Sequence, residues 1–150
     1  MRTTTVMRTV LTPFLAMLLI TGTARADHRF DNRDIVRGEA VYQQQCAVCH
    51  GVKLEGQPNW RQARPDGTLP APPHDETGHT WHHDDSYLIE YTVLGGQGLM
   101  TRRGITGFTS AMPAFGEQLS LDDILNVLAF ISSTWPDEIK LIQASRNSTH

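Results

Sequence analysis

Apolar residues recur every three or four positions in three stretches of the chain, which is the spacing of a helix that buries one face. Helices are expected over residues 34–45, over residues 84–94 before a glycine pair, and over residues 120–134 before Trp135-Pro136. Candidate N-caps are Asp34 for the first helix, Asp84, Asp85 or Ser86 for the second, and Ser120 for the third.

The segments outside these helices are long and irregular. Residues 27–32 form a polar lead-in, residues 51–80 contain five prolines, and residues 97–118 contain four glycines. Residues 137–144 are expected to add a short helical turn, and the tail 145–150 is expected to be mobile. There is no internal repeat and no alternating strand pattern, so the prediction is an all-α fold with extensive loops.

The N-terminus has the order of a secretory signal peptide. Arg2 and Arg8 precede an apolar stretch over residues 10–20, and Ala24-Arg25-Ala26 follows as a cleavage site. We expect residues 1–26 to be removed, leaving one domain over 27–150 with its core at 33–135. An uncleaved anchor is the alternative, although the apolar stretch is shorter than the about 20 residues that a bilayer core needs. No later run approaches that length, so the mature chain is expected in the periplasm without a membrane span.

Charge and cysteine content narrow the class of protein. The 150-residue chain has a formal net charge of −3, and the part after residue 26 has 10 basic and 16 acidic residues, a charge of −6. Nucleic acid is therefore not an expected partner. Two cysteines are too few for a disulfide-stapled small fold or a site with four thiolates. Three helices provide only a small apolar core.

Residues 46–50 have the sequence Cys-Ala-Val-Cys-His, the C-x-x-C-H pattern of covalent haem attachment. Two thiols add to the two vinyl groups of a haem, and the adjacent histidine binds iron through Nε2. A thioredoxin-like dithiol would need a βαβ setting, a disulfide would close a tight ring, and a zinc half-site would need a second ligand pair. The pattern favours one haem c attached to Cys46 and Cys49 with His50 as an iron ligand, and the haem would supply the missing core.

Over nearly all of residues 33–135 the chain resembles the class I cytochrome c family. The matching features are a first helix with Gly38 and Tyr42, Cys-x-x-Cys-His-Gly at 46–51, Met-Pro-Ala-Phe at 112–115, and a last helix with Val127, Phe130 and Ile131. The resemblance implies a cytochrome c fold whose first and last helices cross near Gly38, with an aromatic contact from Tyr42 or Phe130. It also implies histidine and methionine ligation. A carbonyl of the proline stretch 69–73 would accept a hydrogen bond from His50, and the sequence does not say which one. Pro72 of this stretch is also a candidate cofactor-binding residue.

Met112 is the candidate for the sixth iron ligand. After cleavage only Met100 and Met112 remain, and Pro113 would stiffen the loop that presents Met112. Met112 also stands shortly before the last helix, as the ligand of the family does. The alternative is a second imidazole, which would give a lower reduction potential than a thioether. The candidates for it are His74, His79, His82 and His83.

The histidine-rich loop 74–83 also suggests a surface site for copper or zinc, with His79, His82 and His83 as candidate ligands. A polar loop packed over the haem edge is the alternative, and the lack of a defined ligand geometry favours it. Trp60 and Arg61 are the candidate pair for a haem propionate, because their N–H groups can satisfy a partly buried carboxylate.

With both axial positions occupied, the predicted function is that of a periplasmic one-electron carrier, not itself an enzyme, that works with redox partner proteins. The acidic chain has only two lysines, so docking is expected through an apolar haem rim or to a partner with a basic patch. Two alternatives remain: an electron-transfer subunit of a dehydrogenase or oxidase complex, and a haem or copper sensor or metal-handling protein that uses the loop 74–83.

Overall fold

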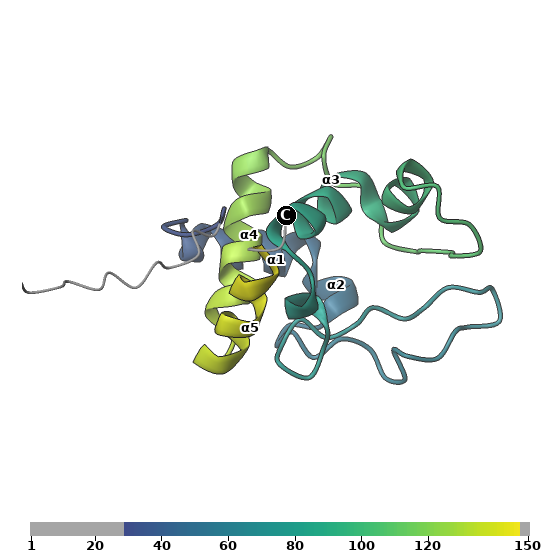
Figure 1. Ribbon diagram of the computed structural model, residues 1–150, viewed down its shortest axis with the longest axis horizontal. Helices are drawn as coiled ribbons and strands as arrows, with labels where there is room; N and C mark the ends of the chain where they lie inside the picture. The colour runs from purple at the N-terminus through teal and green to yellow at the C-terminus, as the bar shows by residue number, and fades with distance from the viewer. Residues whose placement is uncertain (1–28, 148–150) are drawn as a thin grey trace, which may run out of the picture.

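The computed structural model describes residues 29–147, which contain helices and no strand (Figure 1). The helices are α1 Ile35–Gln45, α2 Ala47–His50, η1 Thr80–His82, α3 Asp85–Arg102, α4 Leu121–Ser133 and α5 Asp137–Asn147, η1 being a 3-10 helix. The all-α prediction is confirmed. The expected signal peptide lies outside the described residues. None of the helices in the described range is long and apolar enough to cross a membrane.

The three predicted helices begin at side-chain caps. Asp34, Asp84 and Ser120 each accept a hydrogen bond from the backbone N–H three residues further on, at 2.9, 2.9 and 3.1 Å. Such a cap satisfies an N–H group that has no helical partner, and each contributes about 1 kcal/mol. The starts of α1, α3 and α4 therefore follow from the local sequence.

α1 and α4 cross (Figure 1), and Gly38 lies against Asn126 at the crossing, as the resemblance implies. A methyl group at Gly38 would overlap the backbone carbonyl of Asn126, so this approach requires glycine. One turn along α1, the Tyr42 ring packs against Phe130 with ring centroids 5.5 Å apart. Both aromatic residues of the implied contact take part in it.

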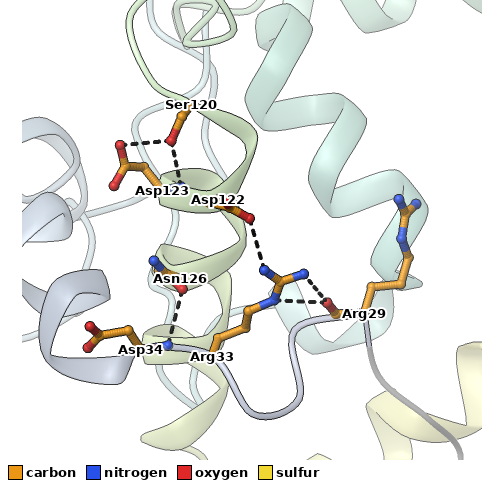
Figure 2. A network of polar contacts seen from close by, with 7 residues as sticks. All are labelled: Arg29, Arg33, Asp34, Ser120, Asp122, Asp123 and Asn126. Carbon is orange, nitrogen blue, oxygen red and sulfur yellow. Dashed lines mark hydrogen bonds and ion pairs between the residues drawn. The ribbon is translucent and has the colours of Figure 1, made fainter.

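Polar contacts hold the start of α1 against α4 (Figure 2). The Asp34 N–H donates to Asn126 Oδ1 at 3.1 Å, and the Arg33 guanidinium donates to Asp122 Oδ1 at 3.0 Å. The same guanidinium donates to the Arg29 carbonyl at 3.4 Å. Exposed ion pairs of this kind contribute about 0–1 kcal/mol. Packing at the crossing therefore supplies most of the attachment.

The core consists of two apolar clusters. One contains Tyr42, Phe130 and Trp135, and the other joins Phe30 to α3 and α4. Phe30 is 4% exposed, although it lies in the segment predicted as a polar lead-in. A single aromatic residue among polar neighbours has no periodicity, so the pattern could not show that it is buried.

Two helices extend beyond their predicted ends. α3 turns sharply at Gly95 but continues as helix to Arg102, inside the stretch predicted to be irregular. α5 runs to Asn147, so residues 145–147, predicted as part of the tail, are helical. The two long connections project to the same side of the helices in Figure 1. An isolated bridge between Thr68 and Thr109 links them.

Candidate functional site

α2 places Cys46 and Cys49 one helical turn apart. The Cys46 N–H donates to the Tyr42 carbonyl at the end of α1, and the Cys49 N–H donates to the Cys46 carbonyl, at 2.8 and 3.1 Å. Both thiols are free; Cys46 is half-buried and Cys49 is exposed. Burial, together with the nearby Cys49 thiol, raises the pKa of Cys46 to about 11, so this thiol is protonated at neutral pH.

His50 is buried and held through one ring nitrogen. Its Nδ1 lies 2.9 Å from the Pro72 carbonyl oxygen, which assigns the ring proton to Nδ1 and leaves the lone pair on Nε2. Burial lowers the pKa of His50, and the hydrogen bond to Pro72 partly opposes this. The ring is therefore neutral at neutral pH, the form that binds a metal. Among the carbonyls of the proline stretch 69–73, Pro72 is the acceptor.

Backbone hydrogen bonds fold the long loop back onto α2 and bring Pro72 to His50. The Gly56 N–H donates to the His50 carbonyl at 2.7 Å, and the Gln57 N–H donates to the Ala71 carbonyl at 2.9 Å. Gly56 has φ 67°, and a methyl group there would overlap the Pro72–Pro73 backbone. A glycine at this position thus allows the proline stretch to lie directly against the histidine.

His74 lies alongside His50. The two imidazoles stack with centroids 4.0 Å apart and planes 21° apart. His74 Nδ1 lies 2.8 Å from Thr80 Oγ1, and the His74 carbonyl accepts the Trp135 indole N–H at 2.7 Å. Burial, and then the neighbouring His50, lower the pKa of His74 well below its ordinary value. A ring stacked face to face with His50 is beside it and not across a metal from it, which argues against His74 as a sixth ligand.

The three candidate ligands of a second metal site do not converge. His79 and His83 have ring centroids 5.5 Å apart, whereas His82 stacks on Trp81 at 3.7 Å. Between residues 29 and 147, no group of three or more histidine, cysteine, aspartate or glutamate side chains is arranged to hold a metal ion. The three histidines are close in the sequence, but their side chains do not form a set of metal ligands.

Trp60 and Arg61 pair with each other. The guanidinium carbon of Arg61 lies 4.0 Å above the Trp60 ring, and Trp60 also stacks on His79 with centroids 5.3 Å apart. A cation–π contact at an exposed site contributes about 0.5–1 kcal/mol. These contacts join the first half of the long loop to its histidine-rich end.

The two methionines have different environments. Met100 is 6% exposed in the second segment of α3, where it packs as a core residue. Met112 is half-buried on a loop. Its N–H donates to Ser110 Oγ and its carbonyl accepts the Gly96 N–H, both at 3.2 Å. Met112 thus combines a fixed backbone with a side chain that is not fully enclosed.

The donor set fits a haem c. It comprises two free thiols on one helical turn, a neutral imidazole oriented through Nδ1, and a thioether on a fixed loop. Sequence reasoning named His74 only as a possible iron ligand and missed its stacking on His50. No sequence signal marks that contact, because the path of the whole loop brings the two rings together.

Comparison with known families gives a match over most of the domain. The model described as cytochrome C oxidase, cbb3-type, subunit III covers residues 33–131, about two thirds of the chain. This range includes the C-x-x-C-H motif, the proline stretch and the Met112 loop, and it ends before α5. Comparisons with curated proteins and with solved structures gave no match. The chain therefore belongs to the cbb3-type cytochrome c oxidase subunit III family and contains a c-type cytochrome domain.

Proposed function

We propose that this protein is an exported one-electron carrier with one haem c, attached through Cys46 and Cys49 and ligated by His50 and Met112. The observation that carries the proposal is the His50–Pro72 hydrogen bond, which orients a buried imidazole immediately after two free thiols. Membership of a c-type cytochrome family supports covalent haem and electron transfer. When bound, the haem supplies an iron whose charge changes by one electron.

Each protein group has a separate task. The two sulfurs keep the cofactor attached while the protein moves between partners. The Pro72 carbonyl fixes the orientation of the His50 ring and makes Nε2 a stronger electron-pair donor to the iron. The Met112 thioether raises the reduction potential relative to a second imidazole. With His50 and Met112 both holding the iron, small molecules would have no open site, which favours electron transfer over catalysis.

The N-terminal pattern supports export to the periplasm, and the acidic mature chain suits docking to a redox protein with a basic patch. The family match favours a second candidate, in which the chain is an electron-transfer subunit of an oxidase complex. Purification without detergent as a single chain supports the free carrier. Reproducible co-purification with larger membrane-bound chains supports the subunit.

Absorption spectra of the purified mature protein in both redox states test the site. We expect a covalent haem spectrum and, in the oxidised state, the weak band near the red end that reports methionine–iron ligation. Met112→Ala should abolish this band and lower the reduction potential, because the thioether that raises the potential is lost.

Met100→Ala is the matched control and should retain the band. Loss of the band in Met100→Ala instead of Met112→Ala would reverse the ligand assignment. A folded, colourless protein with the mass of the bare processed chain would refute haem attachment altogether.

A further inference from the structure

α3 is interrupted at Gly95, and the loop that carries Met112 fills the interruption. Gly95 has φ 69° and ψ 165°, a backbone conformation that residues with a side chain rarely adopt. A helix that stops leaves its last carbonyls without helical partners. Here the carbonyls of Thr92 and Val93 accept the N–H groups of Phe115 at 3.1 Å and Gly116 at 3.0 Å. The chain just after Met112 therefore replaces the missing helical turn.

The backbone of Met112 itself is held on both sides. Its carbonyl accepts the Gly96 N–H and its N–H donates to the Ser110 hydroxyl, each at 3.2 Å. That hydroxyl lies 3.4 Å from the Tyr91 hydroxyl on α3, and the Ser110 N–H donates to the Gln97 side chain at 3.3 Å. The residues before and after Met112 are thus hydrogen-bonded to the two segments of α3 that meet at the break.

The glycine pair at the break leaves no room for side chains. A Cβ at Gly95 would lie 2.9 Å from the Met112 carbonyl oxygen, and a Cβ at Gly96 would overlap the Ser110 hydroxyl. Gly98, two residues further along the same segment, would meet only the Cβ of a neighbouring leucine, at 3.4 Å. The requirement for glycine is therefore specific to the pair that contacts the loop.

We propose that the Gly95-Gly96 break positions the Met112 thioether, and thereby sets how firmly the sulfur holds the haem iron and how high the reduction potential lies. This inference rests on the proposed function, in which Met112 is the sixth ligand. The nine residues between the end of α3 at Arg102 and Met112 do not define the ligand's place alone, because an irregular segment of that length has many conformations. The hydrogen bonds at the break remove this freedom before the ligand bond forms.

Imidazole competes with a weakly held thioether for the iron, so its binding to the oxidised holoprotein measures the effect. We expect Gly95→Ala and Gly96→Ala to raise the apparent imidazole affinity about tenfold, equivalent to about 1.4 kcal/mol. The red-end band should weaken and the reduction potential should fall. Gly98→Ala is the matched control and should bind imidazole as the wild type does.

Ser110→Ala removes the hydroxyl that accepts the Met112 N–H, and it adds no atom. This variant should also raise the apparent imidazole affinity, and it tests the inference if Gly95→Ala and Gly96→Ala do not fold. Wild-type affinity in Gly95→Ala, Gly96→Ala and Ser110→Ala would overturn the inference, as would an equal effect of Gly98→Ala. If the wild type lacks the methionine band and Met112→Ala leaves its spectrum unchanged, the proposed ligation fails first, and the inference falls with it.

Discussion

Two histidines of the loop 74–83 are held in the neutral form by their surroundings. For both His74 and His83 burial is the main cause, and neighbouring imidazoles add to it. The pKa of His83 is lowered to about 4, and its ring stacks on Tyr87 with centroids 4.2 Å apart. A histidine in the unfolded chain titrates at about pH 6.5, so the folded and unfolded states take up the proton at different pH.

This difference predicts how stability depends on pH. Because the pKa of His83 is lower in the folded protein, its contribution is complete above about pH 6.5 and is lost as the pH falls towards 4. We expect the urea midpoint of the holoprotein to decrease between about pH 7 and pH 4.5, and to decrease less in His83→Gln. Leu141→Ala, at an exposed position without a titratable group, should keep the wild-type profile. Identical profiles for His83→Gln and the wild type would contradict the prediction.

At the scale of secondary structure elements, α5 lies outside the range that the family model matches, yet it is anchored in the interior. Its Gln143 side chain is fully buried and donates to Asp85 Oδ1 at 2.8 Å and to the His83 carbonyl at 3.2 Å. α5 therefore connects the end of the histidine-rich loop to the start of α3. The helix packs on η1, the short helix within that loop.

Replacement of Gln143 by alanine should lower the stability of the protein. Gln143→Ala loses both hydrogen bonds, one of them to a buried carboxylate, and leaves a cavity. We expect the free energy of unfolding to fall by about 2–3 kcal/mol in urea denaturation. Leu141→Ala, on the exposed side of the same helix, is the control and should stay within about 0.5 kcal/mol of the wild type. Equal stabilities of the two variants would show that Gln143 is not an anchor.

Across the whole molecule, the helices form the attachment for two long loops that project to one side (Figure 1). The crossing of α1 and α4 fixes the helices, and the loops contribute Pro72, which precedes α3 in the sequence, and Met112, which follows it. The chain after residue 26 has 10 basic and 16 acidic residues, a formal charge of −6, before any haem propionates are counted.

This charge predicts the salt dependence of electron transfer. Reduction by a small cationic inorganic reagent should slow as the ionic strength rises from about 0.01 M to 0.15 M, because screening weakens the attraction. Reduction by an anionic reagent should accelerate over the same range, which provides the control. If the stopped-flow rates for the two reagents change in the same way with ionic strength, the surface near the haem is not negatively charged.

Much of this fold follows from local sequence, because helix starts depend on neighbours within one turn. Asp34 and Ser120 cap the helices that the apolar pattern predicts, and Gly38 lies at the crossing. The continuation of α3 beyond Gly95 and the length of α5 were not predicted. A glycine pair usually ends a helix, and α5 is held by a buried glutamine, which has no apolar periodicity.

The sequence by itself was enough to predict covalent haem attachment, because the C-x-x-C-H pattern depends only on five consecutive residues. Only the tertiary structure decided that Pro72 accepts from His50, that His74 stacks beside it, and that the loop with Met112 lies in the break of α3. Each of these contacts joins residues far apart in the chain. Their partners depend on the paths of long loops, which no local pattern specifies.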